Sequence, residues 1–234
     1  MATEKSQKTP PNQEAASIST LYLVVYNVVQ FFGWFMIFYG LINAGSTKSV
    51  FKICSTLLYI FQTAAILEVV HAALGLVKSN VFLTFFQVLS RVFVVWGISY
   101  SVPETRATNG TTMYLAAWSI TEIVRYAYYA INLLSDVPYF IVWARYTFFI
   151  VLYPIGVTGE LLVFYNALPS VKKSGLYSFH LPNKYNFSFD YYTLLIIGML
   201  TYIPIFPQLY MHMFKQRGKF VSTPKDKEEA KKTK

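Results

Sequence analysis

The chain has 234 residues, of which 55% are hydrophobic and 13% are charged. Because a soluble globular domain carries about 25% charged residues, this composition excludes an ordinary soluble domain and indicates a polytopic membrane protein. The formal net charge of +9 arises largely in the tail after Phe214, which favours a cytosolic juxtamembrane tail over a nucleic-acid partner. The single cysteine, Cys54, excludes an intramolecular disulfide and a multi-cysteine metal site, and no arginine follows it at the spacing of a cysteine phosphatase.

The chain begins with a polar segment and continues with a series of long apolar ones. Residues 1–20 are predicted to be a disordered polar N-terminal segment. Residues 21–213 contain six apolar segments, each long enough to cross a membrane at about 20 residues per span. The sequence therefore predicts an all-α fold, a six-transmembrane-helix bundle with short loops, followed by a basic cytosolic tail over 214–234. The predicted spans are 21–42, 52–77, 81–100, 112–134, 139–166 and 190–213.

Three features predict the orientation of the bundle. Basic residues directly after the last span predict a cytosolic C-terminus, and an even number of spans then places the N-terminus on the same side. The N-glycosylation sequons at Asn109 and Asn186 fall in loops that this topology places in the lumen. The chain ends in KKTK, with Lys231 and Lys232 placed as in the dilysine retrieval signal of endoplasmic-reticulum membrane proteins. We therefore expect a multi-pass endoplasmic-reticulum protein with both termini in the cytosol.

Ionisable residues inside the predicted spans need a structural or functional reason, since a charge at the centre of a span costs about 3 kcal/mol. Residues three or four apart share a helical face, so each such pair is predicted to form one inward-facing patch. Glu122 and Arg125 can neutralise each other, whereas Gln87 and Arg91 need partners on another helix, for which Glu68 is a candidate. His71 is expected to be a hydrogen-bonded core residue, and no metal site is expected because no second histidine lies at ligand spacing. The pairs are Glu68/His71, Gln87/Arg91 and Glu122/Arg125.

The stretch YPIGVTGE, residues 153–160, lies within the fifth predicted span. Tyr153 and Glu160 are about two helical turns apart, so both side chains project from one face. Pro154 cannot donate a hydrogen bond to Ile150, which frees that carbonyl and bends the helix at the tyrosine. The two glycines of the stretch let another helix or a ligand approach the backbone. A kinked packing helix would explain the proline and the glycines, but it explains an unpaired carboxylate poorly, so a functional site is favoured.

Six long segments of the sequence are AILEVVHAALGLV, QVLSRVFVVWGI, WSITEIVRYAYYA, RYTFFIVLYPIGVTGELL, LPNKYNFSFDYY and IPIFPQLYMHMF. Together they resemble the 3-hydroxyacyl-CoA dehydratase family, whose members are also called protein tyrosine phosphatase-like proteins. The resemblance implies a multi-pass endoplasmic-reticulum enzyme of very-long-chain fatty acid elongation. Its reaction would be the third step of the cycle, the removal of water from a (3R)-3-hydroxyacyl-CoA to give the trans-2-enoyl-CoA. The resemblance covers nearly everything from Tyr22 to Phe214.

The resemblance also implies which residues form the site. The family's proposed catalytic tyrosine and glutamate match Tyr153 and Glu160, and Arg145 and Gly156 match further positions of the same motif. Elimination requires a base for the C2 proton and an acid for the hydroxyl that leaves C3. Our hypothesis makes Glu160 the base and Tyr153 the acid, and the reverse assignment stays open.

Supporting roles are assigned as hypotheses. Arg91 is a candidate to stabilise the developing enolate, and Arg145 is a candidate to bind the phosphates of CoA. Gln87 and Glu68 are expected to support the site from neighbouring spans. No cofactor is expected, because acyl-CoA is the substrate. The other expected partners are membrane lipid and the remaining enzymes of the elongation cycle, namely the elongase, the 3-ketoacyl-CoA reductase and the trans-2-enoyl-CoA reductase.

Two other functional classes remain open at this point. The first is a catalytically inactive scaffold or interaction protein of the endoplasmic reticulum, which should bury both Tyr153 and Glu160 against neighbouring helices. The second is a small transporter or proton-coupled channel, which should leave a continuous polar path to both faces of the membrane. An enzyme should instead have a chamber that opens to one side and reaches both residues.

Overall fold

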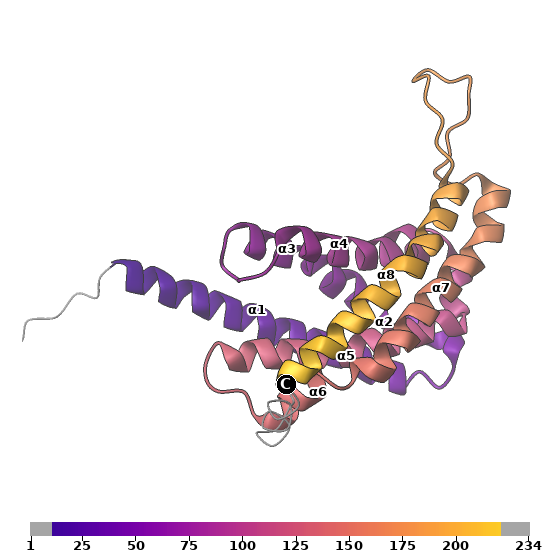
Figure 1. Cartoon of the computed structure of the whole chain (residues 1–234). Helices are drawn as coiled ribbons and strands as arrows, with labels where there is room; N and C mark the ends of the chain where they lie inside the picture. Colours follow the sequence, from indigo (N-terminus) through magenta and orange to yellow (C-terminus); the bar gives the residue numbers. More distant parts are fainter. Residues whose placement is uncertain (1–10, 221–234) are drawn as a thin grey trace, which may run out of the picture.

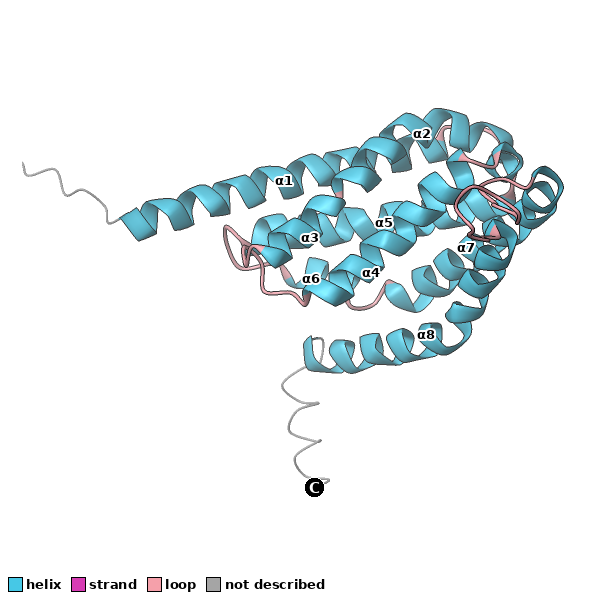
Figure 2. Cartoon of the chain, turned by 90° about the horizontal axis from the view of Figure 1, so that it is seen from above, coloured by secondary structure: helices cyan, strands magenta, loops and turns pink. Residues whose placement is uncertain are grey.

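The computed structural model describes residues 11–220, which form helices joined by loops (Figure 2). Within these residues there is no strand, and Phe179 and Phe189 form an isolated β-bridge. The prediction of an all-α fold is confirmed. The helices are α1 (Pro11–Ile42), α2 (Thr47–Ala64), α3 (Ile66–Ala73), α4 (Val81–Val92), the π-helix η1 (Phe93–Tyr100), the 3-10 helix η2 (Pro103–Ala107), α5 (Asn109–Asn132), α6 (Tyr139–Arg145), α7 (Phe149–Ser174) and α8 (Tyr191–Phe220).

The helices agree with the predicted spans in place, but their ends and continuity differ. The second span is divided at Ala65 into α2 and α3, and the fifth is divided at 146–148 into α6 and α7. α1 begins at Pro11, so residues 11–20 are helical although they belong to the segment predicted to be disordered. Proline suits the first helical position, because the N–H that it lacks would have no partner there. The KKTK motif, residues 1–10 and the tail from 221 onward lie outside the described residues.

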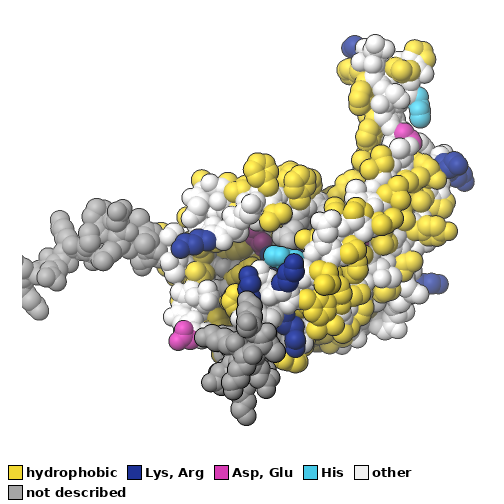
Figure 3. All heavy atoms as spheres, in the orientation of Figure 1, with side chains coloured by type: hydrophobic (Ala, Val, Ile, Leu, Met, Phe, Trp, Pro, Cys, Tyr) yellow, Lys and Arg dark blue, Asp and Glu magenta, His cyan; other side chains and the backbone are white. Residues whose placement is uncertain are grey.

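Five helical segments are long and apolar enough to cross a membrane. Many of their large hydrophobic side chains point outward, and Phe82 and Ile203 are 75% and 70% exposed. Figure 3 shows hydrophobic side chains over much of the visible face, above all along α7 and α8. Apolar surface on this scale indicates that lipid surrounds the bundle. The five segments are 18–42, 47–73, 81–100, 139–174 and 191–220.

α5 is less apolar than these five segments and lies in the interior of the bundle (Figure 1). It packs against α1 on one side and α7 on the other, and these are the most extensive helix contacts among the described residues. Its buried side chains include the polar Glu122 as well as Tyr114, Trp118 and Tyr126. Because other helices cover it, α5 can carry charged groups that a lipid-facing helix could not.

Two glycines bring α5 and α7 into backbone contact. A Cβ atom on Gly159 would lie 2.6 Å from the backbone nitrogen of Tyr114 and 2.8 Å from the carbonyl oxygen of Gly110. A Cβ on Gly110 would meet the carbonyl oxygen of Gly159 at 2.8 Å. Gly156 is less constrained, since its Cβ would lie 3.4 Å from the Cβ of Ala117, an ordinary contact distance. α5 is therefore the helix whose close approach to α7 these glycines allow.

α8 is joined to α7 by a loop, residues 175–190, which projects away from the bundle at the end opposite the first and last described residues (Figure 1). Asp190 caps α8, because its carboxylate accepts hydrogen bonds from the hydroxyl and the backbone N–H of Thr193. These bonds hold the pKa of the Asp190 carboxyl below its usual value. α8 packs mainly against α7 and makes few contacts with other elements.

The two glycines of α7 predict a clear difference between matched substitutions. Gly159→Ala should lower the stability of the purified protein by about 1–3 kcal/mol or more, because the methyl group meets backbone atoms that cannot move aside. Gly156→Ala should change stability by about 1 kcal/mol or less, since its methyl group fits. Thermal unfolding of the two variants in detergent measures the difference, and equal melting temperatures would show that the close contact is absent.

Candidate active site

Glu160 is held by donors from two other helices. The indole N–H of Trp118, on α5, donates to Oε1 of Glu160 at 2.8 Å. The hydroxyl of Tyr202, on α8, donates to Oε2 at 2.6 Å. Both carboxylate oxygens thus accept a hydrogen bond, which is the arrangement that suits an ionised carboxylate, because such a group can only accept. The side chain is partly exposed.

Tyr153 lies on the same helix, and its ring is fixed by stacking on α8. The ring is nearly parallel to that of Phe206, with centroids 5.2 Å apart, and to that of Tyr210, with centroids 6.0 Å apart. Its hydroxyl forms no hydrogen bond with any residue in the range 11–220, so the phenol is free to donate to another molecule. Tyr153 and Glu160 are close enough to interact electrostatically.

Pro154 is the origin of a further link between α7 and α8. Proline has no N–H, so the carbonyl of Ile150 lacks its usual helical donor. In the structure the hydroxyl of Tyr210 donates to this carbonyl oxygen at 3.0 Å. The carbonyl expected to be free therefore has a partner from the neighbouring helix, and that partner also stacks on Tyr153.

A network of buried charges adjoins this pair. Glu122 is 1% exposed and forms ion pairs with Arg91 of α4 and with Arg125 of its own helix. Arg125 also binds both oxygens of Glu68, at 2.8 Å each. The expected pairing of Glu122 with Arg125 is present. The expected pairing of Arg91 with Glu68 is not, because Arg91 pairs with Glu122 instead.

Arg91 connects the charge network to the pair on α7. Its guanidinium lies 5.1 Å from the centroid of the Trp118 ring, whose N–H binds Glu160. It is also within electrostatic range of Tyr153, Glu160 and Tyr202. Of the arginines named from the sequence, Arg91 is therefore the one that the structure places beside the pair.

The other candidate residues lie elsewhere or have different partners. Gln87 is exposed on α4 and does not join Arg91 in an inward-facing patch. A long arginine side chain can turn toward the interior from a helix edge, whereas the shorter glutamine cannot follow it. Arg145 lies among the rings of Tyr128, Tyr129 and Tyr146, and it donates to the Tyr129 hydroxyl at 3.2 Å.

Two further residues match their predicted environment. His71 is buried and shares a hydrogen bond of 2.8 Å with the hydroxyl of Tyr22, as expected for a core histidine. Gly156 is buried on α7, and its contacts are with Ala117 and with Trp118, the donor to Glu160. Gly156 thus lies next to the site, against the helix that supplies Trp118.

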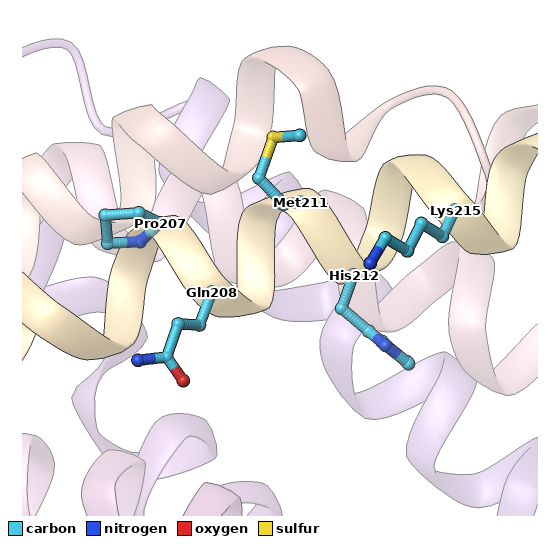
Figure 4. A pocket seen from close by; sticks show the side chains of 5 residues that line it. All are labelled: Pro207, Gln208, Met211, His212 and Lys215. Atoms are coloured by element: carbon cyan, nitrogen blue, oxygen red, sulfur yellow. The ribbon is translucent and has the colours of Figure 1, made fainter.

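An open hollow of about 480 Å³ lies along another part of α8 (Figure 4). Gln208 and His212 point into the space beside the helix, and Lys215 lies one turn further along (Figure 4). Neither Tyr153 nor Glu160 is among the residues that line this hollow, so it is not the chamber expected around the pair. Its lining residues are Pro207, Gln208, Met211, His212 and Lys215.

The sequence did not identify Trp118, Tyr202 and Tyr210, which hold the pair in place. Each lies in a segment that carries the resemblance or next to one, WSITEIVRYAYYA for Trp118 and IPIFPQLYMHMF for the two tyrosines. Aromatic residues make up 18% of this chain, so an additional tyrosine or tryptophan in a span carries no distinguishing signal. Their roles become visible only when α5, α7 and α8 are placed together.

Comparison with known proteins places this site in a family. Residues 62–223 match the family described as protein tyrosine phosphatase-like protein, PTPLA. The matched range includes all of α4, α5, α7 and α8, so the pair and its hydrogen-bond donors lie within the match. No solved structure is detectably similar to the chain.

Curated relatives match most of the chain. Very-long-chain (3R)-3-hydroxyacyl-CoA dehydratase 2 of Homo sapiens is 54% identical over 209 residues, which cover 88% of this chain and 82% of the relative. Dehydratase 1 of Canis lupus familiaris is 45% identical over 222 residues, covering 93% and 89%. The dehydratase PASTICCINO 2A of Oryza sativa subsp. japonica is 39% identical over 215 residues, covering 90% and 97%.

The charge network predicts that Glu122 is essential for stability. Glu122→Gln should destabilise the protein by about 3–5 kcal/mol, because it leaves Arg91 and Arg125 without their shared carboxylate in a buried setting. Glu104→Gln, a matched change at an exposed position, should have little effect. Denaturant or thermal unfolding of both variants tests the difference, and a wild-type midpoint for Glu122→Gln would contradict the assigned network.

Proposed function

Because this chain belongs to the protein tyrosine phosphatase-like family, we propose that it is a very-long-chain (3R)-3-hydroxyacyl-CoA dehydratase, a hydro-lyase of fatty acid elongation. The observation that carries the proposal is the pair on α7. Glu160 has both oxygens engaged by donors, while the phenol of Tyr153, on the same helix, has no partner among the described residues. One acceptor and one free donor are the two groups that elimination of water requires.

The geometry favours one assignment of base and acid. Glu160, with its oxygens bound to the indole of Trp118 and the phenol of Tyr202, acts as the base and removes the proton from C2. The electron pair of the C2–H bond develops as enolate charge on the thioester and then forms the C2=C3 double bond as the C3–O bond breaks. Tyr153 donates its proton to the departing hydroxyl, which leaves as water. The proton then returns from Glu160 to Tyr153 through solvent, so no cofactor is consumed.

Two arginines have proposed roles in binding and charge stabilisation. Arg91 stabilises the enolate that develops at the thioester, since it lies within electrostatic range of both members of the pair. Its pairing with Glu122 offsets part of its charge, so its remaining N–H groups supply the stabilisation. Arg145, held among three tyrosine rings, binds the phosphates of CoA at the end of α6. Glu68 supports the site indirectly, through Arg125 and Glu122.

The proposed topology is a six-span bundle in the endoplasmic-reticulum membrane with both termini in the cytosol. Five apolar segments support membrane insertion, and α5 is the sixth span. Its 24 residues give about 36 Å of helix, which suffices to cross the hydrocarbon core, and its polar side chains are covered by α1 and α7. The first and last described residues lie at the same end of the bundle (Figure 1), as an even number of spans requires.

The chemistry of the reaction defines the partners. The 3-hydroxyacyl-CoA substrate is supplied by a 3-ketoacyl-CoA reductase, and the enoyl product is consumed by a trans-2-enoyl-CoA reductase, with an elongase closing the cycle.

The scaffold alternative is not favoured, because Tyr153 and Glu160 are both partly exposed.

Substitution of the pair tests the activity. Glu160→Gln and Tyr153→Phe should each lower the rate of dehydration by about 100- to 10,000-fold, because each removes one proton-transfer group. Tyr165→Phe, the same change at an exposed position of α7, should keep the wild-type rate. The assay follows the conversion of 3-hydroxyacyl-CoAs of graded length by the purified protein. An inactive wild-type chain, or near-normal turnover by either site variant, would contradict the proposal.

Glycan mapping tests the orientation. A flexible Asn-Gly-Thr acceptor inserted into the projecting loop 175–190 should be glycosylated in microsomes, because the proposed orientation puts that loop in the lumen. The same insert after the C-terminal tail should remain unmodified. A glycan on the tail insert would reverse the proposed orientation.

A further inference from the structure

α8 contacts both members of the proposed catalytic pair through one face. Tyr202, Phe206 and Tyr210 follow one another at intervals of four residues, so their side chains lie along a single stripe that faces α7. Tyr202 donates to Glu160, Phe206 stacks on Tyr153, and Tyr210 both stacks on Tyr153 and donates to the carbonyl of Ile150. The mechanism above uses none of these three residues for proton transfer.

We propose that Tyr202 and Tyr210 are positioning residues of the dehydration, with Tyr202 fixing the carboxylate of Glu160 and Tyr210 fixing the phenol of Tyr153. The inference rests on the proposed function, since it concerns the geometry of that pair. It assigns to α8 the task of aligning the two groups that α7 carries.

Tyr202 fixes the plane of the carboxylate. The terminal torsion of a glutamate is broad, so an unrestrained carboxylate samples many orientations. Two donors from different helices, one on each oxygen, restrict this torsion, because Trp118 lies on α5 and Tyr202 on α8. Loss of the Tyr202 hydroxyl leaves Oε2 without its donor and lets the carboxylate rotate away from the C2 proton.

Tyr210 fixes the position of the phenol in two ways. Its ring and that of Phe206 are nearly parallel to Tyr153, at interplanar angles of 5° and 8°, so they limit rotation of the Tyr153 ring. Its hydroxyl also satisfies the carbonyl of Ile150, which Pro154 leaves without a helical donor. An unsatisfied carbonyl inside a membrane is costly, so this bond stabilises α7 at the turn that carries Tyr153.

The test is the separation of kcat from KM in the purified full-length protein. Tyr202→Phe and Tyr210→Phe should each lower kcat by about 10- to 100-fold, as misplacement of a catalytic group by about 1 Å does, and should change KM by less than about threefold. Tyr192→Phe is the matched control on the same helix and should keep the wild-type kcat and KM. A general loss of folded protein would instead reduce the active fraction, which titration of active protein reveals.

The outcomes distinguish this inference from the proposed function. If the wild type dehydrates the substrate and Glu160→Gln is inactive, but Tyr202→Phe and Tyr210→Phe keep kcat within twofold of the wild type, the positioning role is wrong and the proposed function stands. If the wild type itself is inactive, both are overturned. If Tyr202→Phe does not yield folded protein, Trp118→Phe removes the other donor to the same carboxylate, and an unchanged kcat in that variant overturns the role of the donors.

Discussion

The backbone contact between Gly110 of α5 and Gly159 of α7 is the constraint on which the site depends. Because neither residue has a Cβ, the two helices approach more closely than side chains would allow, and a Cβ on either would meet a carbonyl oxygen at 2.8 Å. This approach brings the indole of Trp118 within 2.8 Å of Glu160. Glu160 is the residue after Gly159, so the contact that joins the helices also sets the distance between the carboxylate and its donor.

The same packing explains why α5 can be the most polar long helix in an apolar bundle. Covered by α1 and α7, α5 supplies Glu122 and Arg125, and these groups are neutralised by Arg91 and Glu68 from other helices. A charge at the centre of a lipid-facing span would have no such partners. Arg91 belongs to this network and also lies over Trp118, so the charges that stabilise the bundle extend to the side of the proposed catalytic pair.

Local features of the site could be predicted from the sequence, whereas its tertiary partners could not. Helical periodicity placed Tyr153 and Glu160 on one face, and the chemistry of proline predicted the freed carbonyl of Ile150. Both follow from a single helix. The donors Trp118, Tyr202 and Tyr210 depend on which helices adjoin α7, and the partner of Arg91 depends on which carboxylate the folded chain brings within reach of its side chain. Spacing within one helix carries no information on either question. For this reason the sequence allowed Glu68 as a partner of Arg91 as readily as Glu122.

α8 completes the site although it is the long helix with the fewest contacts to the bundle. It packs mainly against α7, and beyond the stripe of aromatic rings it borders an open hollow into which Gln208 and His212 point (Figure 4). A helix that packs mainly on one side can align the groups on α7 while leaving open space along its other side. A substrate with a polar CoA moiety and a long acyl chain needs such space, because its thioester must reach residues in the middle of the bundle. The polar residues of α8 follow the helix from the level of Gln208 toward the basic residues at its C-terminal end, so access from that end agrees with the proposed cytosolic position of the tail.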